Sequence, residues 1–151
     1  MRPRTLQEVA ALTRVGPDWD LHLRGFLDAF YALSDDPASE ALSIADEPDF
    51  VGDVRIDAFL GGVGEHLARR WGLPIPPWVR GPGRRLDRPM FVPDDEAMRG
   101  YLLGASPVAF RTRMIFTGAD PLQRARFPYE EGTRSLPSTF PSTFPSTFPA
   151  L

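Results

Sequence analysis

Residues 86–125 read LDRPMFVPDDEAMRGYLLGASPVAFRTRMIFTGADPLQRA, and this stretch indicates how the C-terminal half of the chain folds. Large apolar side chains alternate here with a run of arginines, and two prolines, Pro93 and Pro107, precede segments of helical character. Proline is well tolerated in the first turn of a helix, because the N–H that it lacks has no partner there. The stretch therefore predicts a folded half with a basic, partly aromatic surface, and it contains no catalytic signature.

Three helices are expected within this stretch. The first begins at Asp94, the second at Ser106-Pro107, and a short third runs from Asp120 to Ala125. Aspartate and serine are preferred at these positions because their side chains accept hydrogen bonds from the free N–H groups of the first turn. The apolar residues assigned to the first helix are Met98, Tyr101, Leu102 and Ala105, and those assigned to the second are Val108, Phe110, Ile115 and Phe116.

Upstream, residues 19–31 (WDLHLRGFLDAFY) form the most regular segment of the chain. Their large apolar residues recur three or four positions apart, which is the spacing of one face of an α-helix. We expect this face to lie in the core, with the helix opening at Pro17 or Asp18. The residues of the face are Trp19, Leu23, Phe26, Leu27, Phe30 and Tyr31.

Three more helices are marked by their start and stop signals. Thr5 to Glu8 is a capping box for a helix that ends near Gly16, and Asp36-Pro37 opens a helix that ends before Pro48. Gly52-Asp53 begins a longer helix over residues 54–71, which Gly72 ends. Three glycines in the middle of that helix weaken it, so we expect another part of the backbone to approach it closely there. They are Gly61, Gly62 and Gly64.

The segment from Leu73 to Pro93 contains six prolines and cannot form a continuous helix. We predict an extended crossover between two helical layers, held by Ile75, Trp78 and Leu86, although a polyproline segment for a recognition domain is an alternative. From residue 127 the chain changes again, and Pro-Ser-Thr-Phe occurs three times at 137–148. Such low-complexity sequence is typical of disorder.

The predicted fold is therefore all-α: a single-domain bundle of about six helices over residues 1–126, with a proline-rich crossover and a disordered tail at 127–151. No segment has the length of a membrane span, and the N-terminus lacks the apolar core of a signal peptide. We accordingly expect a cytoplasmic protein that does not enter a membrane.

The charged residues are unevenly distributed along the chain. All 17 basic residues are arginine, and the net charge is −3. Residues 1–70 hold 7 arginines and 13 acids, whereas residues 71–126 hold 9 arginines and 5 acids. The two halves either attract one another across the fold or leave a basic face for an acidic partner.

No combination of residues predicts catalysis or a cofactor. The chain has no cysteine, and its two histidines, His22 and His66, lack the spacing of a zinc motif. Carboxylates are plentiful but occur at helix starts and on expected solvent faces. We therefore expect no catalytic residue, no metal and no cofactor.

Two kinds of partner remain open. Residues 5–26 resemble the first two helices of a helix-turn-helix, but the second helix is acidic, which disfavours DNA contact there. The arginines of the C-terminal half are better candidates to contact a protein partner or, as the alternative, the phosphates of a nucleic acid. The expected partner-binding residues are Arg80, Arg84, Arg85, Arg88, Arg111 and Arg113.

Several short sequences resemble a small family of all-helical bacterial proteins from high-GC genomes. They are EHLARR at 65–70, GLP at 72–74, PW at 77–78, LDRPMF at 86–91, SPVAFR at 106–111 and IF at 115–116. The family has tryptophan where this chain has Met90 and asparagine where it has Met114. Its members are similar to antitoxin-like companions of nucleotidyltransferase-like proteins, so the resemblance implies a non-catalytic role in binding a protein partner.

Overall fold

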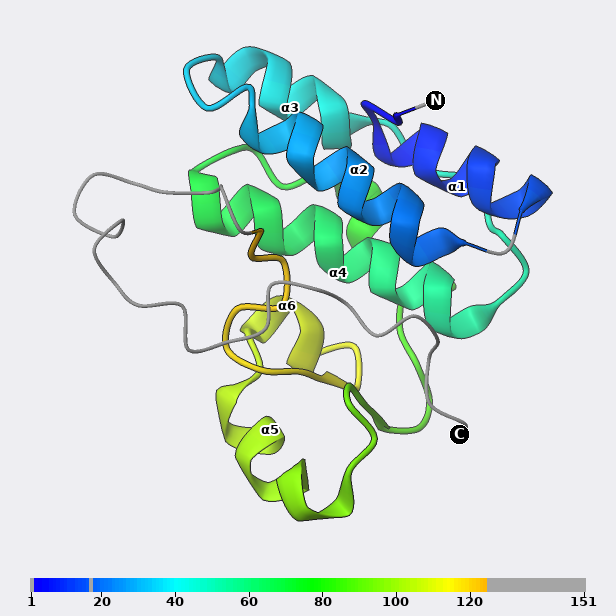
Figure 1. The fold of residues 1–151 in the computed structure, drawn as a ribbon, viewed down its shortest axis with the longest axis vertical. Helices are drawn as coiled ribbons and strands as arrows, with labels where there is room; N and C mark the ends of the chain where they lie inside the picture. The colour runs from blue at the N-terminus through cyan, green and yellow to red at the C-terminus, as the bar shows by residue number, and fades with distance from the viewer. Residues whose placement is uncertain (1, 17, 125–151) are drawn as a thin grey trace.

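The helix α4 (Val54–Trp71) runs through the middle of the computed structural model, which describes residues 2–16 and 18–124 (Figure 1). The Asp53 carboxylate accepts a hydrogen bond from the N–H of Arg55 at 2.9 Å and begins the helix. Gly72 ends it with φ 69°, a left-handed conformation that glycine adopts without a steric penalty. The bounds predicted from the sequence are confirmed.

Three helices form a layer on one side of α4: α1 (Leu6–Val15), α2 (Trp19–Tyr31) and α3 (Pro37–Ala45) (Figure 1). Thr5 caps α1 by accepting from the N–H of Glu8 at 3.1 Å, and Asp36 caps α3 by accepting from the N–H of Ser39 at 3.1 Å. The carboxylate of Glu8 accepts from the N–H of Arg4 rather than of Thr5. All six residues of the predicted apolar face of α2 are buried. This layer folds as its caps and periodicity predict.

The proline-rich segment packs against α4 and contains a short 3-10 helix, η1 (Pro77–Arg80). Trp78 and Leu86 are buried as predicted, and Ile75 is half-buried against the core. The indole N–H of Trp78 donates to the carbonyl of Ile44 at 3.0 Å, so the segment is tied to the end of α3 as well. The crossover is therefore a fixed part of the fold.

The glycines of α4 permit this close packing, mostly by side chains rather than by backbone. A methyl group at Gly62 would lie 2.6 Å from the ring of Phe110, and one at Gly64 would lie 2.9 Å from a methyl group of Val79. At Gly61 the backbone does come close, since the carbonyl oxygen of Arg84 would lie 3.3 Å from an added methyl. Small residues are therefore required along this face of α4.

The helix predicted from Ser106 through Phe116 is wrong beyond residue 111. Helix α6 covers only Val108–Arg111, and Ile115–Phe116 instead form a strand, β2, parallel to β1 (Met90–Phe91). The N–H of Met90 donates to the carbonyl of Met114 at 2.8 Å, and Met114 has φ 64°, which no right-handed helix allows. The backbone N–H groups of Met90 and Val92 donate to the carbonyls of Met114 and Phe116. This strand pairing takes the place of a helix beyond residue 111.

The helix expected at Asp94 is shorter and more exposed than predicted. Asp95, not Asp94, is the cap, and it begins the 3-10 helix η2 (Glu96–Met98), which leads into α5 (Arg99–Ala105). Of the predicted core residues, only Leu102 is buried, while Met98 and Tyr101 are exposed. The short helix predicted from Asp120 is replaced by a turn within the described residues. The predicted tail at 127–151 lies outside them.

The all-α class is confirmed: six α-helices and a single two-residue strand pair make up the regular structure of the described residues, apart from the two 3-10 helices. The core lies between the α1–α3 layer and α4 and continues below α4 to Phe110 and Ile115. Within residues 2–16 and 18–124, no helix has both the length and the apolar character needed to cross a membrane.

Candidate functional site

The six arginines predicted to bind a partner do not share one surface. Arg84 and Arg113 are buried, contrary to their expected role as partner contacts. The remaining four are exposed: Arg80, Arg85, Arg88 and Arg111. A buried guanidinium whose terminal nitrogens bond to internal oxygens is held in the fold and does not reach a partner, so the prediction mixed structural and surface arginines.

Arg84 fixes the residues that precede α4 to the proline-rich segment. Its guanidinium donates to the carbonyl of Pro48, contacts a carboxylate oxygen of Glu47 at 3.2 Å, and donates to the carbonyl of Asp57 at 3.3 Å. The same group lies 4.2 Å from the ring centre of Phe50, a favourable cation–aromatic contact. Because the side chain is 0% exposed, its function is structural.

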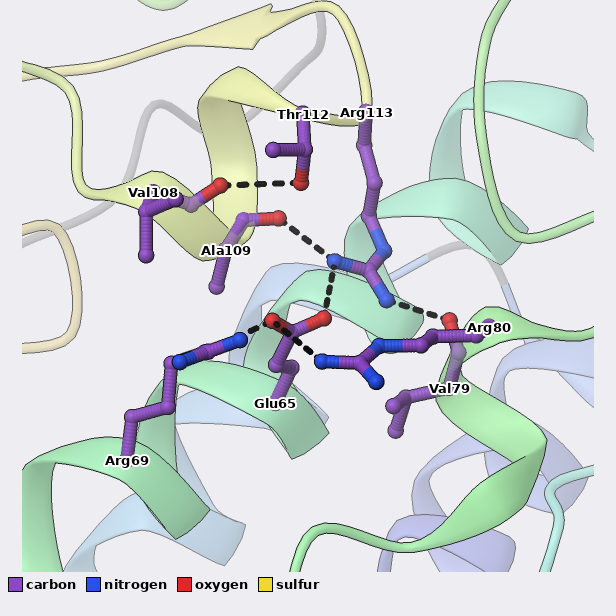
Figure 2. Close-up of polar contacts among 8 residues, drawn as sticks. All are labelled: Glu65, Arg69, Val79, Arg80, Val108, Ala109, Thr112 and Arg113. Carbon is purple, nitrogen blue, oxygen red and sulfur yellow. Dashed lines mark hydrogen bonds and ion pairs between the residues drawn. The ribbon is translucent and has the colours of Figure 1, made fainter.

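Arg113 and Glu65 form a buried ion pair that joins three elements (Figure 2). Arg113 Nη1 donates to Glu65 Oε1 at 2.9 Å and to the carbonyl of Ala109 at 2.6 Å, and its Nη2 donates to the carbonyl of Val79. Glu65 belongs to α4, Ala109 to α6 and Val79 to η1. The pair therefore holds η1 and α6 against α4.

The second carboxylate oxygen of Glu65 faces two exposed arginines. Arg69 Nε donates to Oε2 at 2.7 Å, and Arg80 Nη2 lies 3.8 Å from the same oxygen, as Figure 2 shows. Burial alone would raise the pKa of Glu65, but the hydrogen bonds from Arg69 and Arg113 outweigh it and hold the pKa below its usual value. Glu65 is therefore ionised at neutral pH.

Glu65, Arg69, Arg80 and Arg113 line a cleft of about 280 Å³. Five of the lining residues are arginines, and Glu65 is the only acid among the lining residues that the structure describes. The arginines are Arg69, Arg80, Arg84, Arg85 and Arg113. The lining thus has a formal excess of four positive charges, which falls to three once the pairing of Arg84 with Glu47, outside the lining, is included.

The donors of the exposed arginines in this cleft are largely free. Across residues 2–16 and 18–124, neither Arg80 nor Arg85 has an acceptor within hydrogen-bond distance. Arg69 uses its Nε for Glu65, and its other donors have no acceptor in the same part of the chain. The cleft therefore offers positive charge and directed N–H groups, which are what carboxylates and phosphates bind.

The sequence prediction missed Arg69 and Glu65 and included two arginines that do not line the cleft. Arg88 is exposed elsewhere, and Arg111 donates to the carbonyl of Ser106. The spacing of Glu65 and Arg69, four residues apart on a helix, was an available signal of an ion pair. No signal in the sequence places Arg113 opposite Glu65, because they are 48 residues apart.

Two features of the described residues concern groups other than the arginines of the cleft. Among the described residues, no three histidine, aspartate or glutamate side chains lie close enough to hold a metal ion. Burial, with a smaller effect from Arg70, lowers the pKa of His66 to about 4, so the imidazole is neutral at pH 7. Its ring packs against the ring of Phe110. The arrangement is suited to binding an anion.

Comparison with known proteins yields no relative, since no family model, no curated protein and no solved structure matches the chain. The interpretation of the cleft consequently depends on its own residues and on their geometry.

Proposed function

We propose that this chain is a non-catalytic interaction module that binds an acidic group of a partner protein in the arginine-lined cleft. The observation that supports it is the uncompensated charge of that cleft, where Arg69, Arg80 and Arg85 have donors without acceptors among the described residues. Arginine is enriched where proteins recognise carboxylates and phosphates, because its planar fork binds two oxygens at once.

A protein partner is favoured over a nucleic acid by the composition of the cleft. Single-stranded nucleic acids are usually bound by aromatic side chains on which the bases stack, and none is present among the described residues that line it. Duplex binding needs a long basic surface, whereas the arginines of the cleft lie together at one place on a chain with a net charge of −3. An acidic side chain of a protein meets neither difficulty.

The partner to test first is a nucleotidyltransferase-type protein. The resemblance of residues 65–70, 86–91 and 106–111 to antitoxin-like companions of such proteins is the reason for this choice. Glu65 and Arg69, which shape the cleft, belong to the first of these segments. The module would then inhibit the partner protein by binding an acidic group of that partner in the cleft.

The test compares two double variants with the same change of charge. Arg69→Glu with Arg80→Glu reverses the cleft, and Arg88→Glu with Arg111→Glu reverses exposed arginines of the chain outside the cleft. Each full-length chain is used to capture partners from its host, with and without nuclease, and the captured proteins are identified by mass spectrometry. We expect a nuclease-resistant partner that the first variant loses and the second retains.

The salt dependence of binding separates this proposal from nucleic-acid binding. Binding to duplex phosphates weakens with a log–log slope of about −0.9 per phosphate neutralised, so several contacts give a steep dependence. One or two charged contacts in a protein interface give a shallow one. Capture of nucleic acid alone, or equal loss in both double variants, would refute the proposal.

A further inference from the structure

The charge and donors of the cleft indicate which anion it is built to take, and this step depends on the proposed function. We propose that the cleft binds a phosphoryl group carried by a phosphorylated side chain of the partner, in preference to a plain carboxylate. The partner would then be recognised according to whether it is modified.

The number of available donors exceeds what one carboxylate can use. In the described part of the chain Arg85 has no acceptor, and Arg80 makes no hydrogen bond, only an ion-pair contact of 3.8 Å with Glu65. Arg69 keeps the donors that Glu65 does not occupy. A carboxylate has two oxygens, whereas a phosphoryl group presents three acceptor oxygens arranged as a tetrahedron. The three guanidinium groups of Arg69, Arg80 and Arg85 therefore match a phosphoryl group better than a carboxylate.

The charge balance gives the same answer. Glu65 offsets Arg113 and Glu47 offsets Arg84, so three positive charges remain around the cleft, on Arg69, Arg80 and Arg85. A carboxylate brings one negative charge, while a phosphoryl group brings about 1.5 to 2 at pH 7. A carboxylate would leave most of the excess charge unneutralised in the cleft.

Glu65 acts here as a positioning residue and does not oppose the anion strongly. Its side chain is 5% exposed, and both of its oxygens already accept hydrogen bonds, from Arg113 and Arg69. The bond at 2.7 Å fixes Arg69 by its Nε, which leaves the terminal nitrogens of that fork available. The carboxylate thus orients the arginine that contacts the ligand.

The size and walls of the cleft suit a modified side chain. Its volume of about 280 Å³ is below the roughly 300–1,000 Å³ of clefts that hold drug-sized ligands. Val79 and Val108 are its apolar lining residues, and Val108 is 49% exposed. A phosphoryl group can therefore reach the arginines while the carbon that bears it contacts valine.

The experiment uses the full-length chain and three fluorescent pentapeptides, Ala-Asp-X-Asp-Ala, in which X is phosphothreonine, glutamate or threonine. Fluorescence anisotropy measures their affinities. We expect the phosphothreonine peptide to bind about tenfold or more tightly than the glutamate peptide, because it adds charge and an acceptor oxygen. Its affinity should fall several-fold from pH 7.5 to 5.5, since the second pKa of the phosphoryl group is about 6, while that of the glutamate peptide should not.

Variants show whether the cleft is responsible. Arg80→Lys keeps the charge but removes the fork, and Arg80→Ala removes both, so we expect graded losses for the phosphothreonine peptide. Arg88→Ala is the matched control, because Arg88 is exposed and does not line the cleft. Thermal melting confirms that each variant is folded, which matters most at Arg80 because its Nη2 lies 3.8 Å from the buried carboxylate of Glu65.

Each outcome decides something. Equal affinity for the phosphothreonine and glutamate peptides, with both weakened by Arg80→Ala, refutes the phosphoryl preference and leaves the proposed function standing. Inorganic phosphate that competes at concentrations near the peptide's own dissociation constant would make free phosphate the ligand and refute the claim about a modified partner. Binding that Arg80→Ala leaves unchanged contradicts both this inference and the proposed function.

Discussion

Arg113 and Arg84 are buried because the fold offers each of them a carboxylate and carbonyl oxygens. Arg113 meets Glu65 and the carbonyls of Val79 and Ala109, while Arg84 meets Glu47 and two further carbonyls. Removing one partner of such a pair leaves a charge in the interior without compensation. These two arginines are therefore expected to control stability, and the exposed ones to control binding.

Replacing Glu65 tests this division at a single residue. We expect Glu65→Ala to lower the free energy of unfolding by about 3–5 kcal/mol, because Arg113 stays buried without its counter-charge. Adding Arg113→Met should restore part of the loss, since the unpaired charge is then gone. Urea denaturation followed by circular dichroism measures both. A loss below about 1 kcal/mol for Glu65→Ala, the range of a surface pair, would show that the pair is not held in the interior.

His66 gives a prediction for pH. Burial, assisted by Arg70, lowers the pKa of His66 from 6.5 to about 4. Between these values the unfolded chain binds a proton that the folded chain does not, so stability is fully present above pH 6.5 and falls as the pH decreases toward 4. Each pH unit corresponds to about 1.4 kcal/mol, which gives a total of about 3 kcal/mol.

The measurement is a series of urea denaturations between pH 7.5 and 4 for the wild-type chain and His66→Gln. The variant lacks the titrating imidazole, so its stability should fall less over this range. Carboxylates titrate in both chains and cancel in the comparison. Parallel curves for the two proteins would mean that His66 is accessible to protons in the folded state.

At the scale of elements, the parts predicted correctly are those whose signals are local. Asp53 and Gly72 define the ends of α4, and Asp36 with Pro37 defines the start of α3, because caps act through neighbouring backbone groups. The end of α6 and the strand at Ile115 depend on backbone donors of Met90 and Val92 that are more than twenty residues away. Periodicity within one segment contains no information about them.

The glycines of α4 and α5 provide a matched pair of substitutions. In Gly62→Ala the new methyl group would lie 2.6 Å from the ring of Phe110, so we expect a loss of about 1–3 kcal/mol from overpacking that exceeds the gain in helix propensity. In Gly104→Ala nothing lies within 4 Å of the new methyl group, and the helix should gain up to about 1 kcal/mol. In both thermal and urea denaturation, the midpoint should fall for Gly62→Ala and rise for Gly104→Ala. A shift of the two variants in the same direction would contradict the packing described for α4.

For the whole molecule, the uneven charge found in the sequence is used in two ways. Several ion pairs within the chain join an arginine of the second half to an acid of the first: Arg84 to Glu47, Arg113 to Glu65, and Arg124 to Asp28. Of the exposed arginines of the second half, Arg80 and Arg85 line the cleft. Composition identified the basic half correctly, but only the three-dimensional arrangement separates the arginines that hold the halves together from those with free donors.

Stability should also be distributed unevenly over the molecule. Helix α4 is buried along most of its length, whereas α5 buries only Leu102 and exposes Met98, Tyr101 and Leu103 around it. An element with few buried apolar contacts opens locally, without global unfolding. We therefore expect the amides of residues 102–105 to exchange with solvent at least about 100-fold faster than those of residues 58–68, since opening α5 exposes little core.

Native-state hydrogen exchange with mass spectrometry measures this difference on peptides from the two helices. The exchange of α5 should be almost insensitive to low concentrations of urea, because a local opening exposes little new surface, and that of α4 should follow the global unfolding transition. Gly104→Ala offers a check within the same experiment, since a gain of up to about 1 kcal/mol should slow the exchange of α5 by up to about fivefold, and that of α4 by no more than the same factor. Equal protection and equal urea dependence in the two helices would mean that α5 unfolds only with the rest of the molecule, and that the single buried leucine is enough to couple it to the core.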